Sequence, residues 1–190
     1  PKVFDSDNDF LSDGLEIGLT TPQSPSGQSS GYMLLGTDMN IFIADTEPST
    51  TTSPIDDDSD DDGILDGNED TNRNGAREAG ETYATDSDSD DDGLNDGLEN
   101  GLSAPQGSGT PSTWLHDIDQ TTRTDPLNPD SDDDGLKDGE EDSNTNGKVD
   151  AFEPDPNNPD SDGDGLKDGN HNTVIELYLD TITLTNYPLM

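Results

Sequence analysis

Aspartates at alternate positions open five similar twelve-residue segments, which begin at Asp5, Asp58, Asp88, Asp130 and Asp160. The segment DSDDDGILDGNE is typical, with acids at positions 1, 3, 5, 9 and 12 and glycine at position 6. Calcium takes roughly six to eight oxygen ligands, and its known loop supplies them from positions 1, 3, 5, 7, 9 and 12. Position 7 gives a backbone carbonyl, and glycine at position 6 makes the turn. We call these segments D-loops and expect each to bind calcium.

Two further segments, which we call N-loops, keep this spacing but carry asparagine at positions 3 and 5. They are DTNRNGAREAGE from Asp70 and DSNTNGKVDAFE from Asp142. Asparagine is a neutral oxygen donor, so it keeps the coordination while reducing the charge. Five D-loops and two N-loops together predict about seven calcium sites.

The predicted ligands are the side chains at positions 1, 3, 5, 9 and 12 together with the carbonyl of position 7. In the D-loops they are Asp5, Asp7, Asp9, Leu11, Asp13, Glu16; Asp58, Asp60, Asp62, Ile64, Asp66, Glu69; Asp88, Asp90, Asp92, Leu94, Asp96, Glu99; Asp130, Asp132, Asp134, Leu136, Asp138, Glu141; and Asp160, Asp162, Asp164, Leu166, Asp168. In the N-loops they are Asp70, Asn72, Asn74, Ala76, Glu78, Glu81; and Asp142, Asn144, Asn146, Lys148, Asp150, Glu153.

Two D-loops depart from the pattern. Phe10 stands where glycine is expected, so a non-glycine residue must make that turn. His171 stands at position 12 of the last D-loop, and imidazole is a poor calcium ligand, so we expect this site to be weak or completed from elsewhere.

The alternative reading is that the acids simply cluster in solvent. Against it, 30 of the 46 acidic residues fall on ligand positions of the seven loops, and glycine occupies position 6 in six of them. Weaker candidates share the spacing without the glycine turn, and whether they bind as independent sites stays open. They are Asp45, Glu47, Ser49, Ser53 and Asp56, and their duplicates Asp117, Asp119, Thr121, Asp125 and Asn128.

The loops repeat in a larger unit. The loop starts at Asp58, Asp70 and Asp88 recur 72 residues later, which indicates a tandem duplication. We divide the chain into a partial unit (1–19), a linker (20–44), one repeat unit (45–102), a second linker (103–116), the duplicate unit (117–171) and a β-strand segment (172–190). A β-hairpin is expected between the apolar runs of 32–44.

The overall charge of −39 excludes nucleic acids and anionic lipid surfaces as partners. With 24% hydrophobic residues and no cysteine, composition leaves two possibilities, an acidic tail or a fold held by cations. No apolar run approaches the length of a membrane span. The loop spacing favours the cation-held fold.

The runs TDPLNPDSDDDGLKDGEE and NNPDSDGDGLKDG resemble the thrombospondin type-3 repeat found in many bacterial surface proteins. The resemblance covers most of 45–171 and 5–16. It implies mostly irregular, calcium-stabilised tandem loops with short helical turns and minor β structure, in an extracellular or cell-surface protein that acts as a stalk, spacer or adhesive element.

The EF-hand is the competing family, and it requires helices on both sides of each loop. Glu69 is followed at once by Asp70, which leaves no room for an exiting helix. Apolar residues occupy position 7 in every D-loop, and we expect them to form a thin seam between repeats. Single helical turns such as 97–100 are compatible with the pattern.

No nucleophile or phosphate-loop context surrounds the two histidines, so we expect no enzyme activity. The alternating segment 173–187 predicts a strand, either the start of a neighbouring domain or a strand donated to an identical subunit. The Thr/Ser/Pro tracts could carry O-glycans. A structural segment of a surface protein or filament is the leading interpretation. The alternative is a calcium-dependent adhesion or recognition module with Trp114 and the Ser/Thr/Pro loops as its contact surface.

Overall fold

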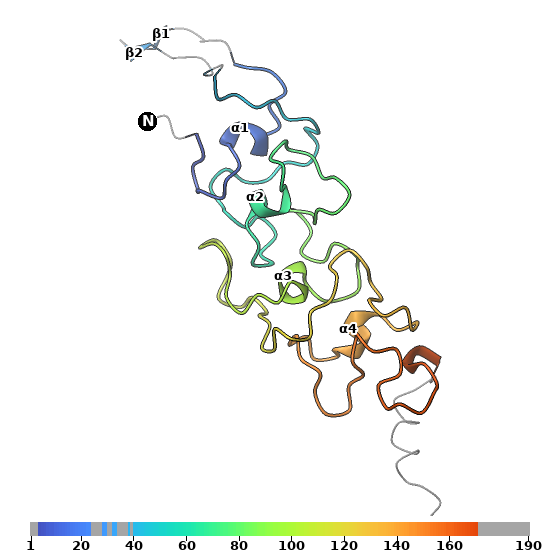
Figure 1. The fold of residues 1–190 in the computed structure, drawn as a ribbon. Helices are drawn as coiled ribbons and strands as arrows, with labels where there is room; N and C mark the ends of the chain where they lie inside the picture. The colour runs from blue at the N-terminus through green and yellow to red at the C-terminus, as the bar shows by residue number, and fades with distance from the viewer. Residues whose placement is uncertain (1–3, 24–27, 30–31, 34–37, 39, 171–190) are drawn as a thin grey trace, which may run out of the picture.

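The computed structural model describes residues 4–23, 28–29, 32–33, 38 and 40–170. Most of these residues lie in turns and irregular loops, as the resemblance to the thrombospondin type-3 repeat implies. The helices are α1 (Asp13–Glu16), α2 (Asp66–Glu69), α3 (Asp96–Glu99), α4 (Asp138–Glu141) and the 3₁₀ turn η1 (Asp168–Asn170). The described chain is elongated, and these short helices follow one another along its length (Figure 1).

Each α-helix is the last turn of a D-loop, at positions 9 to 12, and η1 covers positions 9 to 11 of the last D-loop. The residue before it is extended, as at Asn95 with ψ 151°, and its carbonyl accepts the first helical hydrogen bonds. The turn expected at 97–100 is therefore present but begins one residue earlier, inside the loop. In the described residues the longest helix has four residues, so no EF-hand helix pair flanks these loops.

Two different sequences end the helices. After α1 and α3, Gly18 and Gly101 adopt φ of 76° and 74°, a conformation that glycine reaches without steric cost. Leu19 N–H then donates back to Gly14 C=O at 2.8 Å, which closes a Schellman-type cap. After α2 and α4 the next residue, Asp70 or Asp142, already belongs to an N-loop.

The apolar core is a thin seam, as predicted. Its buried residues come from positions 7, 8 and 11 of the first three D-loops and are Leu11, Leu15, Ile64, Leu65, Leu94 and Leu98. Leu136 is half-buried, whereas Leu166 in the last D-loop is 56% exposed. The seam therefore fades toward the end of the described chain.

The hairpin prediction was wrong in its register. Strands β1 (Gln28–Ser29) and β2 (Tyr32–Met33) pair antiparallel, with Gln28 opposite Met33 and Ser29 opposite Tyr32. Only two residues separate the strands in the sequence, the loop length that tight hairpins favour, so Tyr32 and Met33 pair with the segment before them. Residues 40–44 form no strand. The strand expected at 173–187 and His171 lie outside the described residues. Within the described chain, no helix is long and apolar enough to cross a membrane.

Candidate metal centres

All D-loops share one backbone path. Position 4 adopts positive φ at Asn8, Asp61, Asp91 and Asp133, and position 6 does so in every loop. Phe10, which replaces the glycine, reaches φ 86°, so the expected non-glycine turn is confirmed. The guanidinium of Arg73 lies 4.9 Å from the centre of the Phe10 ring.

The position 1 carboxylate organises the curve of each loop. Asp58 accepts the N–H of Asp62 at 3.1 Å and of Gly63 at 3.0 Å, one on each carboxylate oxygen. Asp88, Asp130 and Asp160 accept the equivalent pair of N–H groups. Position 5 is held in the same way, because Asp62 accepts the N–H of Ile64 at 2.7 Å.

Position 9, predicted as a ligand of its own loop, is tied to the serine at position 2. Asp66 accepts the N–H of Ser59 at 2.7 Å on one oxygen and its hydroxyl at 2.6 Å on the other. Ser6, Ser89 and Ser131 make the same pair of bonds to Asp13, Asp96 and Asp138. The sequence analysis missed this serine, although all five D-loops begin with Asp-Ser.

The acids gather into two kinds of cluster. Within a loop, positions 1, 3 and 5 meet, as in Asp58, Asp60 and Asp62, with ligand atoms within 4.8 Å of one another. The second kind spans two loops, because positions 5 and 12 meet position 9 of the next D-loop. These junction clusters are Asp9, Glu16 and Asp66, and Asp62, Glu69 and Asp96. Position 9 is thus brought to the loop before its own.

Glycine at position 10 makes that junction possible. The N–H of Gly97 donates to Asp62 Oδ2 at 3.1 Å, and a Cβ on Gly97 would overlap the Asp62 carbonyl oxygen. Gly139 repeats the contact with Asp92, and Gly169 repeats it with Asp134. The sequence analysis gave this glycine no role, although every D-loop has Asp-Gly at positions 9 and 10.

Many carboxylate oxygens in these clusters are buried and have no hydrogen-bond donor. They belong to positions 3, 5 and 12, on Asp7, Asp9, Asp60, Asp90, Asp132, Glu16, Glu69, Glu99 and Glu141. Glu141 is 0% exposed, and neither of its oxygens has a partner. A buried polar group without a partner costs free energy, and a buried charge costs far more. These oxygens are therefore poised for a ligand that supplies positive charge.

The same crowding appears in the pKa values. Burial, and then the neighbouring Asp62 and Asp60 carboxylates, raise the pKa of Glu69 to about 11. The same two causes, with Asp92 and Asp132 as the leading neighbours, raise the pKa of Glu99 and Glu141 to about 9. Without a cation these groups hold protons at neutral pH, because their anions would lie close together in a dry environment.

The residues fit a hard divalent cation. Carboxylate oxygens are the ligands that calcium prefers, and several converge on each cluster, some of them without any hydrogen-bond donor. Among the described residues, Lys137 and Lys167 donate to the carbonyls of Asp91 and Asp133 rather than to the orphaned carboxylates.

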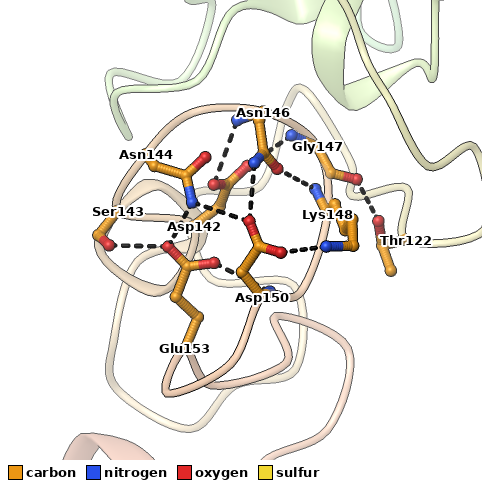
Figure 2. A network of polar contacts seen from close by, with 9 residues as sticks. All are labelled: Thr122, Asp142, Ser143, Asn144, Asn146, Gly147, Lys148, Asp150 and Glu153. Atoms are coloured by element: carbon orange, nitrogen blue, oxygen red, sulfur yellow. Dashed lines mark hydrogen bonds and ion pairs between the residues drawn. The ribbon is translucent and has the colours of Figure 1, made fainter.

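The N-loops contain the predicted residues but satisfy them internally. Figure 2 shows the second N-loop, where the amides of Asn144 and Asn146 donate to Asp150 at 3.3 and 3.0 Å. Lys148 forms an ion pair with Asp150, and these bonds lower the pKa of the Asp150 carboxyl. Glu153 accepts the hydroxyl of Ser143 at 2.9 Å.

The first N-loop makes related bonds. Asn74 and Asn72 donate to the two oxygens of Glu78 at 2.9 and 2.8 Å, and these bonds lower the Glu78 pKa. Glu81 accepts the N–H groups of Thr71 and Glu78 at 3.0 and 2.9 Å. In both loops, therefore, the asparagine amides face the acids through their nitrogen atoms.

The weaker candidates lie against the N-loops. Thr46 N–H donates to the Asn74 carbonyl at 2.9 Å, and Ile118 N–H makes the equivalent bond to Asn146 at 3.0 Å. Asp45 is buried, its Oδ2 has no partner, and its side chain fills the space beside Gly75. These segments therefore hydrogen-bond to the backbone of the N-loops, a contact that the sequence spacing did not indicate.

The segment 103–116 does more than connect the two units. The N–H groups of Ser108 and Gly109 donate to Asp57, and the hydroxyl of Thr110 donates to Asp58. Trp114 lies against Gly63, and its indole N–H donates to the carbonyl of Asp62. This segment therefore covers the Asp58 loop from outside.

Comparisons with protein-family models, with curated proteins and with solved structures found no match to this chain.

Proposed function

We propose that this chain is a calcium-binding structural protein whose D-loops complete their folding around the metal. The observation that carries the proposal is the set of buried carboxylate oxygens without hydrogen-bond donors. In the cluster of Asp9, Glu16 and Asp66, whose ligand atoms lie within 4.8 Å of one another, these are Asp9 Oδ2 and both oxygens of Glu16. Burial and mutual repulsion disfavour the ionised acids in the metal-free fold, and a divalent cation reverses the sign of that interaction.

The energy scale supports a role in folding. At a calcium concentration ten times the dissociation constant, one site adds about 1.4 kcal/mol to the free energy of unfolding. Five D-loop sites would add up to about 7 kcal/mol, within the range of the stability of an ordinary domain. The thin seam of six buried apolar residues makes such a contribution necessary.

The proposed location outside the cell follows from the calcium affinity expected for such loops. Calcium modules that work outside cells bind at about 10⁻⁴–10⁻³ M, a range that the cytosol does not reach. We therefore place the protein outside the cell or on its surface, as an extended element of a surface protein or filament. The recognition alternative relied on Trp114, whose indole N–H is used within the chain, so we favour the structural role.

Calorimetric calcium titration with stoichiometry tests the proposal, using the full chain and a matched pair of variants. Glu141→Gln removes a carboxylate with two unpartnered oxygens, so we expect calcium affinity at one site to fall tenfold or more. Glu153→Gln alters an N-loop acid whose oxygens already have donors, so the D-loop sites should bind unchanged. If the wild-type chain binds no calcium at millimolar concentration, the proposal is wrong.

A further inference from the structure

Asparagine is followed by glycine at three places in the chain, at Asn74, Asn100 and Asn146. Two of these steps are positions 5 and 6 of the N-loops, where four of the five D-loops carry Asp-Gly. Glycine has no Cβ, so nothing shields its backbone nitrogen from the side-chain carbonyl carbon of the asparagine before it. That nitrogen is the internal nucleophile of asparagine deamidation, and the N-loop geometry bears on this reaction at two atoms.

The glycine nitrogen of each N-loop is hydrogen-bonded to a carboxylate. Gly147 N–H donates to Asp142 Oδ2 at 2.7 Å (Figure 2), and Gly75 N–H donates to Asp70 Oδ2 at 2.7 Å. A carboxylate within hydrogen-bond reach of a proton occupies the position of a general base. The attacking nitrogen therefore has its proton acceptor in place.

The asparagine side chain is held for attack by the same loop. Asn146 Oδ1 accepts the N–H of Lys148 at 2.9 Å, and its Nδ2 donates to Asp150 Oδ2 at 3.0 Å. The first bond is an Asx turn, which spans Gly147 and holds the side-chain carbonyl beside the glycine nitrogen. The Lys148 N–H lies on the oxygen that becomes negative when its carbon is attacked, as an oxyanion donor does. Asn74 repeats both side-chain bonds, at 2.8 and 2.9 Å.

We propose that Asn74 and Asn146 are deamidation sites at which the N-loop assists its own modification. The glycine nitrogen bonds to the asparagine Cγ and passes its proton to the position 1 carboxylate. The Cγ–Nδ2 bond then breaks, and Nδ2 leaves as ammonia after the carboxylate returns the proton through water. A water molecule opens the cyclic imide at Cγ to give aspartate, or at the backbone carbonyl to give isoaspartate. One water is consumed and one ammonia is released, so the reaction requires no cofactor and no second protein.

Aspartate at position 5 is the residue that the D-loops carry. The two loop types share positive φ at positions 4 and 6, with 53° at Thr145 and 73° at Gly147, so this product fits the existing backbone path. It loses the Nδ2 donor, and its new carboxylate faces the acid at position 9. The consequence rests on the proposed function, because the modified loop gains the kind of unpartnered acids that draw calcium to a D-loop. Isoaspartate instead lengthens the backbone and disrupts the path.

The third Asn-Gly step lacks both aids. Gly101 N–H donates to the Leu98 carbonyl at 2.9 Å rather than to a carboxylate, and Asn100 Nδ2 donates to the Asp96 carbonyl at 2.9 Å. Among the described residues, none donates to Asn100 Oδ1. Asn100 is exposed, whereas both N-loop asparagines are half-buried, so exposure alone would make it the fastest of the three. It is therefore an internal control.

Peptide mapping by mass spectrometry of the full chain, aged at mildly alkaline pH in millimolar calcium, tests the proposal. The readout is the conversion of each amide to an acid, with released ammonia as a second measure. Asn74 and Asn146 should convert about tenfold or more faster than Asn100, because a base and an oxyanion donor act on both. In concentrated urea the three rates should converge, since all three share one dipeptide. Asn144, which precedes Thr145, should keep its amide throughout.

Asp142→Asn is the matched variant, because it keeps an acceptor for Gly147 N–H but removes the base. Asn146 should then slow toward the rate of Asn100. Asn74 in the same molecule should convert unchanged, which shows that the chain is folded. The proposal is overturned if Asn100 converts as fast as the N-loop asparagines in the native chain, or if the Asn146 rate survives Asp142→Asn.

Calcium titration of Asn146→Asp tests the consequence for binding, and this variant should bind more calcium than the wild type. Equal stoichiometry in two proteins that both bind calcium would overturn the gained cluster. A wild type that binds no calcium, yet deamidates fastest in its N-loops, would overturn the proposed function and support the modification site.

Discussion

The D-loops and N-loops follow the same spacing, but the environments of their position 9 acids shift the pKa in opposite directions. At position 9, burial raises the pKa of Asp66 and Asp96 to about 6, whereas hydrogen bonds lower the pKa of Glu78 and Asp150. A neutral amide at positions 3 and 5 can donate to a neighbouring acid, and a carboxylate cannot. The replacement of aspartate by asparagine thus changes a cluster with unpartnered carboxylate oxygens into a network in which the acids accept hydrogen bonds.

Calcium removal is the largest test of this difference. Chelation at neutral pH should lower amide exchange protection strongly in the D-loops, for example at Gly93 N–H, which donates to Asp88, because unscreened carboxylates repel. Gly147 N–H, which donates to Asp142 at 2.7 Å, should lose less protection. Hydrogen exchange by mass spectrometry with and without chelator measures both. Equal loss in the two loop types would show that they unfold as one unit.

The pH dependence of the chelated protein should come next in size. The raised pKa values of Glu69, Glu99 and Glu141 mean that the metal-free fold binds more protons than the unfolded chain. That stabilisation is complete below the ordinary pKa of about 4.5 and is lost as pH rises through about 9. Acidifying from pH 8 to pH 5 in chelator should therefore increase stability in urea.

In calcium, acidifying from pH 8 to pH 5 should instead lower the stability in urea, because protons compete with the metal for the same carboxylate oxygens. Urea denaturation curves at pH 8 and pH 5, each with and without calcium, check both predictions. A chelated protein that loses stability on acidification would contradict the assignment of these glutamates.

The contact between position 10 of one D-loop and position 5 of the preceding D-loop should have a smaller effect on stability. Gly97→Ala places a methyl group against the Asp62 carbonyl and should cost about 1–3 kcal/mol of unfolding free energy in calcium. The N-loops carry Ala79 and Ala151 at position 10, where a side chain is already present, so the close contact of the D-loop glycines is not expected there. Gly14→Ala, whose site is open, is the matched control and should not destabilise the chain. Urea denaturation distinguishes the two.

The serine at position 2 should give the smallest difference. Ser89→Ala removes the 2.6 Å hydroxyl bond to Asp96 and should cost about 0.5–1.5 kcal/mol. Ser143→Ala removes a single 2.9 Å bond to Glu153, an acid with other donors, and should cost less. The same denaturation assay applies, and a larger loss for Ser143→Ala would reverse the order that the geometry predicts.

The sequence predicted the features that one loop determines alone. The spacing of acids located every loop, the turn at Phe10 formed without glycine, and position 7 supplied the seam at Leu11, Ile64 and Leu94. Periodicity within twelve residues was enough for each of these results. The hairpin register was missed, because two short apolar runs outweighed a two-residue connection.

Contacts between loops were not predictable in the same way. Asp62 and Gly97 are separated by 35 residues, and nothing in either loop specifies which other loop it meets. The Asp-Ser and Asp-Gly pairs recur in all five D-loops and were visible in the sequence, but the sequence did not show which residues they contact. The orientation of the asparagine amides likewise depends on acids whose positions only the folded loop defines.

The placement of Trp114 has a practical consequence. It is the only tryptophan in the chain, and its ring lies on the backbone of Gly63 inside one D-loop, whereas Gly93 and Gly135 have open space at the equivalent positions. Indole emission from the unlabelled protein therefore originates beside a single loop. The molecule carries its own optical probe, which distinguishes events at that loop from events at its otherwise similar neighbours.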